Sequence, residues 1–135
     1  MGIDGNLYRI FLIAHLVAVV AAFGPLFLYP RLRRAGETST IASMHMRFVF
    51  PALVLLWALG MGLAGLSDDV WELSQTWLTL SIINWVALLV VSWFLIRPAI
   101  GDPSESATSR LAAGVGVTHL LLVVGLYLMV FKPGL

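Results

Sequence analysis

Long apolar stretches alternate with short polar segments along this chain, and four of the stretches are long enough to cross a membrane. They cover about residues 7–29, 41–66, 76–96 and 111–131. A helix needs ~20 apolar residues to cross a hydrocarbon core of about 30 Å. Helices are expected because backbone groups inside a bilayer must pair within their own segment, and because the stretches lack the apolar–polar alternation of barrel strands. The pattern predicts an all-α membrane protein with four transmembrane helices.

The polar segments between the stretches predict how the helices are arranged. The expected connections are residues 30–40, 67–75 and 97–110. Short connections make successive helices antiparallel neighbours. The last connection contains Pro98 and Gly101, a composition that is typical of loops. The chain is therefore expected to form one integral membrane domain, a four-transmembrane-helix antiparallel bundle.

Basic residues are distributed unequally over the two ends of this predicted bundle. The first and third connections hold Arg31, Arg33, Arg34, Arg97 and Arg110. The opposite end holds Arg9 and Lys132. Because arginine and lysine accumulate on the cytoplasmic side, the asymmetry predicts a multi-pass protein of the bacterial cell (inner) membrane with both termini outside the cytoplasm.

The composition fits a bilayer environment and excludes several kinds of site. Of the 135 residues, 60% are hydrophobic and 11% are charged, whereas a soluble domain has about 25% charged residues. A net charge of +1 provides no basic face for nucleic acid. The absence of cysteine excludes disulfides, thiolate catalysis and iron–sulfur clusters. The expected partners are the lipid bilayer and either a membrane-protein complex or further copies of the chain.

A few polar residues inside the spans are the candidates for chemistry. They are His15, Ser81, Asn84 and His119, together with His45 in the polar lead-in of the second span. Intramembrane ionisable groups are functional hypotheses by default. The alternative is structural, since a side-chain hydrogen bond between membrane helices contributes about 0.6 kcal/mol on average. Both interpretations stay open for His15 and His119, and the structural one is preferred for Asn84.

Helix periodicity and depth predict which of these residues meet. His15 shares a face with small alanines, and His119 shares one with Ala112 and Gly116, so both rings are expected to point into the bundle. At a rise of ~1.5 Å per residue, His15 and Asn84 both lie about 12 Å from the side that carries the termini. His119 lies about 12 Å from the opposite side, which disfavours a haem held between it and His15.

The segment Met44-His45-Met46 combines soft ligands that suit copper(I). Adjacent helical residues point in different directions, however, so the three side chains are not expected to converge on one ion. We predict no metal site.

The first span and its exit carry a recognisable set of residues. His15 is followed by Phe23-Gly24-Pro25 and then by Tyr29-Pro30-Arg31. This arrangement resembles uncharacterised small bacterial four-helix integral membrane proteins, which are similar to copper-resistance D proteins and to HemJ-type protoporphyrinogen oxidases. The resemblance implies a haem b site at His15, and the residues of the fourth span offer His119 as a second ligand.

Three hypotheses on function follow. The first is a small accessory or complex-forming membrane subunit without catalytic activity. The second is a haem- or quinone-associated redox protein that uses His15, with His119 as a second ligand or proton donor. The third is copper or small-solute transport along a path lined by the intramembrane polar residues.

Overall fold

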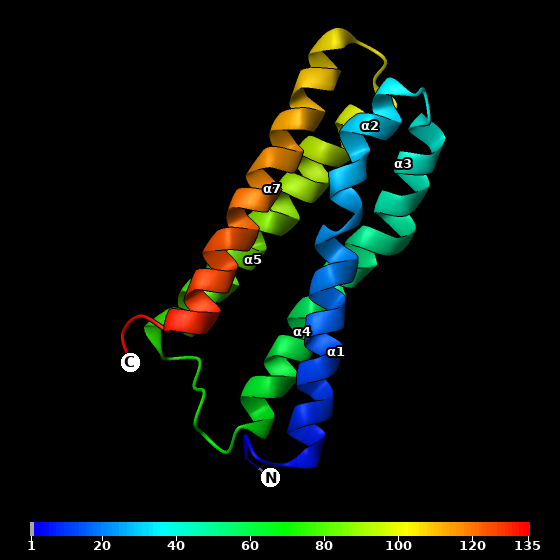
Figure 1. Ribbon diagram of the computed structural model, residues 1–135. Coiled ribbons are helices and arrows are strands. Elements are labelled where there is room, and N and C mark those ends of the chain that lie inside the picture. Colours follow the sequence, from blue (N-terminus) through cyan, green and yellow to red (C-terminus); the bar gives the residue numbers. More distant parts are fainter. Residues whose placement is uncertain (1) are drawn as a thin grey trace.

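The computed structural model describes residues 2–135, and each of the four apolar stretches forms a helix that runs the length of the molecule (Figure 1). The four spans are Asn6–Arg34, Thr38–Leu66, Thr76–Gly101 and Glu105–Phe131. All four are long and apolar enough to cross a membrane. No strand occurs within residues 2–135. The predicted fold class, an all-α four-helix membrane bundle, is confirmed.

Only the fourth span is one uninterrupted α-helix. The first comprises α1 (Asn6–Phe23), a 3₁₀ turn η1 (Pro25–Leu28) and α2 (Tyr29–Arg34). The second comprises α3 (Thr38–Met44), a π-helical segment η2 (His45–Val49) and α4 (Phe50–Leu66). The third comprises α5 (Thr76–Val90), a second π-helical segment η3 (Val91–Ile96) and α6 (Arg97–Gly101). The fourth is α7 (Glu105–Phe131).

Prolines explain where the second and third spans change winding. A proline lacks the backbone N–H, and its ring collides with the carbonyl four residues earlier. Pro51 and Pro98 each follow a π-helical segment by two residues, at a position where a new α-helical stretch begins. The wider π turn moves the carbonyl away, so the helix continues past the proline. The expectation of a loop over 97–110 is therefore wrong except at residues 102–104, because Pro98 lies in the first turn of α6.

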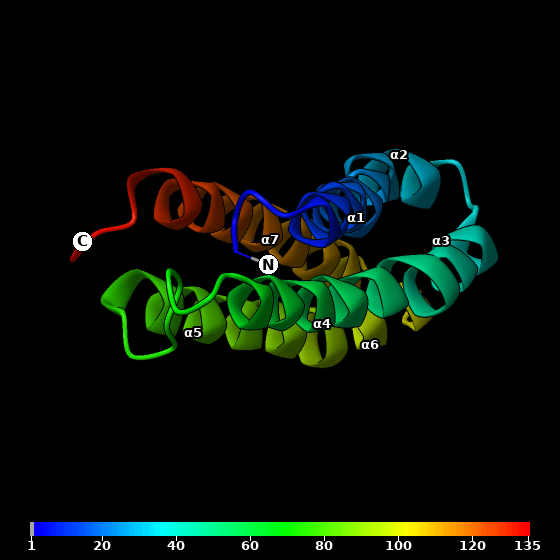
Figure 2. The same ribbon diagram turned by 90° about the horizontal axis from the view of Figure 1, so that it is seen from below.

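The helices associate in two pairs that diverge toward one end of the molecule. α1 packs chiefly along α4, and α5 packs along α7 (Figures 1 and 2). Both termini and the segment 67–75 lie at the end where the pairs separate, which we name the terminal end. At the opposite end, residues 35–37 and 102–104 connect the helices, and α2, α3 and α6 pack together there. We name this the arginine end.

Glycines allow the closest helix contacts, but not at every position that the small-residue pattern favoured. A Cβ built on Gly62 would lie 2.7 Å from the Phe11 ring, so α1 and α4 approach closely there. The predicted contact face of Ala112 and Gly116 is wrong, because both residues are exposed and a Cβ on Gly116 would meet nothing within 4 Å. Gly114, which is buried, makes that contact instead. Three adjacent small residues in α7 left the choice of face ambiguous.

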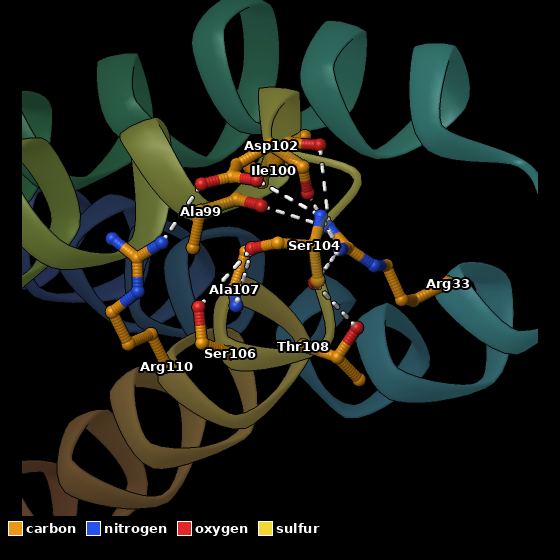
Figure 3. A network of polar contacts seen from close by, with 9 residues as sticks. All are labelled: Arg33, Ala99, Ile100, Asp102, Ser104, Ser106, Ala107, Thr108 and Arg110. Atoms are coloured by element: carbon orange, nitrogen blue, oxygen red, sulfur yellow. Dashed lines mark hydrogen bonds and ion pairs between the residues drawn. The ribbon is translucent and has the colours of Figure 1, made fainter.

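Arg33 joins two spans at the arginine end (Figure 3). Its guanidinium donates to the carbonyl oxygens of Ala99 at 2.8 Å and Ile100 at 3.4 Å, which end α6. It also donates to the carbonyls of Asp102 at 2.6 Å and Ser104 at 3.3 Å. The last carbonyls of a helix lack intrahelical partners and carry partial negative charge. Arg33, at the end of the first span, therefore supplies hydrogen bonds to the open carbonyls at the end of the third span. This role is additional to the one predicted for it in membrane topology.

Asp102 organises the start of α7 beside this arginine. Its carboxylate accepts from the Ser104 backbone N–H and from Arg110, both at 2.9 Å. These hydrogen bonds, the Ser104 contacts first, hold the pKa of Asp102 below its ordinary value. The Ser104 hydroxyl in turn accepts from the Ala107 backbone N–H at 3.2 Å, which makes Ser104 the N-cap of α7.

Replacing Arg33 tests this cap. We expect Arg33→Ala to lower the free energy of unfolding in mixed micelles by about 1–2 kcal/mol, because several carbonyls at a half-buried helix end lose a charged donor. Arg33→Lys should recover only part of the loss, since an ammonium cannot reproduce the planar fork. Arg34→Ala, which removes an exposed guanidinium from the same helix, is the control and should stay near the parent value. Equal losses in the Arg33 and Arg34 variants would rule out the cap.

Candidate functional site

A cavity of about 150 Å³ lies between the two diverging helix pairs. Its walls come from α1, α4, α5 and α7, and Trp71 of the segment between α4 and α5 adds to them. The lining is apolar apart from a few groups, of which His15, Ser81 and Asn84 are those singled out from the sequence. The cavity is only partly enclosed. A sizeable apolar space with few polar groups is the usual form of a ligand pocket.

His15 is the one ionisable group among the residues that line this cavity. α1 places it against α4, where Gly60 leaves room for the ring: a Cβ on Gly60 would lie 3.3 Å from His15 Cε1. The side chain is 8% exposed, and its Nδ1 has no hydrogen-bond partner within residues 2–135. A buried polar atom without a partner is costly, and most such atoms in folded proteins are paired. Nδ1 is therefore buried against α4 without a partner, while the ring as a whole borders the apolar cavity.

Asn84 and Ser81 line the cavity from α5. Asn84 Nδ2 donates to the Leu121 carbonyl of α7 at 3.0 Å, and Gly125 leaves space for the amide. Ser81 donates to the Trp77 carbonyl of its own helix at 2.8 Å. The structure thus brings Asn84 to the same cavity as His15, with its amide engaged in a contact between helices.

His119 lies elsewhere. It does not line the cavity, and its ring stacks on Phe27 with centroids 4.0 Å apart. Its Nε2 is buried and has no hydrogen-bond partner in the part of the chain that the structure describes. The structure does not bring His119 and His15 to a common cavity.

His45 forms a buried polar cluster near the arginine end that the sequence did not reveal. Tyr29 Oη lies 3.0 Å from His45 Nδ1, and Ser92 Oγ and O lie 2.9 and 3.1 Å from Nε2. His45 and Tyr29 are both 0% exposed. The cluster joins the first three spans and links the two π-helical segments near their starts, since His45 is the first residue of η2 and Ser92 is the second residue of η3. The Phe50-Pro51 and Arg97-Pro98 pairs are the signal that could have located these segments.

The Ser92–His45 contact resembles a nucleophile and its base, but its hydrogen bonding differs. The Ser92 carbonyl oxygen can only accept, so the proton of the neutral ring is on Nε2, and Nδ1 accepts from the Tyr29 hydroxyl. Nε2–H then points to Ser92 and cannot take a proton from its hydroxyl. An activated serine requires the opposite arrangement. We therefore assign the cluster a structural role.

Neither copper nor haem fits the residues that the structure gathers. No group of three histidine or carboxylate side chains that could hold a metal ion occurs within residues 2–135. His45 is buried and Met46 is 38% exposed, so the Met44-His45-Met46 segment does not converge. An apolar cavity of about 150 Å³ accepts a single six-membered ring. A porphyrin contains four pyrrole rings, so the enclosed part of this space is too small for a haem, and no second histidine lines it.

Comparisons with known proteins give no further assignment. No protein-family model, no curated protein and no solved structure matches the chain. The fold by itself defines the class: a polytopic protein with four helices that are long and apolar enough to span a membrane.

Proposed function

We propose that the protein is a small integral membrane subunit that binds a lipid-soluble molecule with a hydrogen-bonding headgroup at His15. The observation that carries this proposal is the His15 ring, which is 8% exposed and is the one ionisable group among the residues that line the cavity. The headgroup is small, because the cavity has a volume of about 150 Å³. Its apolar tail extends through the open side of the cavity toward the bilayer.

The remaining architecture suits a non-catalytic subunit of a larger assembly. The two connections at the arginine end are residues 35–37 and 102–104, so no extramembrane domain is inserted there. Five of the eight basic residues lie at that end, which supports its placement on the cytoplasmic side of a bacterial inner membrane. Among the earlier hypotheses, association with a small lipid-soluble molecule fits the cavity better than haem, copper or solute transport.

Retention of lipid-like probes tests the proposal. The protein is placed in nanodiscs and exposed to decylubiquinone or to 1-decanol, two probes that carry a ten-carbon chain and a polar head. We expect at least one probe to bind above the level of empty nanodiscs. His15→Leu should weaken that binding about three- to tenfold, the loss of one hydrogen bond. His119→Leu should leave binding within a factor of two, because His119 does not line the cavity.

Two results would contradict this function. Retention of neither probe above empty nanodiscs would remove the evidence for a ligand site. An absorption band near the Soret region that shifts on reduction, and is lost in His15→Leu, would show that a haem is bound and that the volume argument is wrong.

A further inference from the structure

The cavity that His15 lines also has an aromatic wall. Trp57 of α4 and Trp85 of α5 both line the cavity, with ring centroids 5.6 Å apart and planes 28° apart. Trp85 Nε1 donates to the Leu53 carbonyl of α4 at 2.8 Å, which fixes the orientation of the indole. The pair is therefore held as a stacked unit that borders the cavity where the third span meets the second.

The spacing of the two indoles decides how a ligand can use them. Carbon atoms in contact lie about 3.5–4.0 Å apart, so a ring inserted between two others needs a gap of roughly 7–8 Å. The observed 5.6 Å is too small. A flat ring can only lie against the face of the wall that borders the cavity, with its edge free to reach a group on another helix.

Core packing alone does not account for this wall. Protein interiors contain few voids larger than a water molecule, because side chains fill the available space. Here two tryptophans border an unfilled apolar space, and Trp57 is 41% exposed. His15 lines the same space from α1 and is the one ionisable side chain among the lining residues.

We propose that the cavity selects a flat conjugated ring with a hydrogen-bonding oxygen, of the quinone or phenol class, over an aliphatic headgroup. The ring lies on the Trp57–Trp85 wall, and its oxygen pairs with His15. This inference rests on the proposed function, and it adds the chemical class of the ligand. Aromatic stacking contributes about 0.5–1.5 kcal/mol beyond buried area, which corresponds to a preference of about two- to tenfold.

Comparing the two probes on tryptophan variants tests the ring class. Wild-type protein in nanodiscs should retain decylubiquinone in clear preference to 1-decanol. Trp85→Leu should weaken decylubiquinone binding about two- to tenfold and leave 1-decanol binding unchanged. Trp93→Leu is the matched control, because Trp93 packs against Phe50 and Arg97 and does not line the cavity. Where Trp85→Leu does not fold, Trp57→Leu provides the same test on a more exposed side chain.

The results of this experiment distinguish the ring class from the proposed function on which it depends. Equal retention of both probes, with Trp85→Leu and Trp57→Leu affecting them equally, would overturn the ring class and leave a lipid-binding site. A loss confined to decylubiquinone would support the ring class. Retention of neither probe by wild-type protein would overturn both proposals.

Discussion

His45→Ala is expected to lower the free energy of unfolding by about 2–4 kcal/mol. The substitution removes a ring that is 0% exposed and leaves the buried Tyr29 hydroxyl without its partner. Hydrogen bonds between membrane helices average only about 0.6 kcal/mol, so the larger part of the loss comes from the empty space and from the stranded hydroxyl. Reversible unfolding in mixed micelles, followed by tryptophan fluorescence, measures the change.

A second histidine within the spans provides the comparison. His119→Ala removes a partly exposed ring whose Nε2 has no partner in the described chain, so it loses mainly the stacking on Phe27. We expect a cost of about 0.5–1.5 kcal/mol. His45→Gln, which keeps a donor and an acceptor, should lie between the alanine variant and wild type. If His45→Ala were no less stable than His119→Ala, the Tyr29–His45–Ser92 cluster would not hold the spans together.

The transmembrane architecture was predictable because a bilayer imposes one strong constraint. Every stretch of about 20 apolar residues has to pair its backbone internally, so hydropathy gave the number and class of the helices. Helix ends were less predictable. α6 extends the third span to Gly101, since Pro98 follows a π-helical segment and sits where its missing N–H is not needed.

The polar residues were predictable only where a single residue carried the signal. His15 stood out because an ionisable group in an apolar run is expensive. The His45 cluster did not stand out, because its partners come from two other spans. Tyr29 lies near a predicted interface, where tyrosine commonly anchors, and Ser92 is an ordinary small residue. The contacts among Tyr29, His45 and Ser92 depend on how three helices are rotated about their axes. The length and hydropathy of a helix do not specify that rotation.

Gly114→Ala tests the rotation of α7 and is expected to destabilise the protein by about 1–3 kcal/mol. The added Cβ would lie 2.7 Å from Ile96 Cγ1 and 3.4 Å from the Leu95 side chain. Ile96 is 1% exposed and sits in the π-helical segment η3, so displacing its side chain disturbs buried packing. The strain exceeds the gain of about 0.5–1 kcal/mol that alanine brings over glycine in a helix.

The glycine-to-alanine change at Gly116, two residues further along α7, should have the opposite effect on stability. A Cβ on Gly116 would meet nothing within 4 Å, so Gly116→Ala keeps the helix gain and adds no clash. We expect it to unfold at the wild-type midpoint or slightly above it, while Gly114→Ala unfolds earlier. Both variants add one methyl group to the same helix, so intrinsic helix propensity cannot separate them. Destabilisation by Gly116→Ala with a neutral Gly114→Ala would mean that α7 presents the Ala112–Gly116 face to the bundle, as the small-residue pattern had predicted.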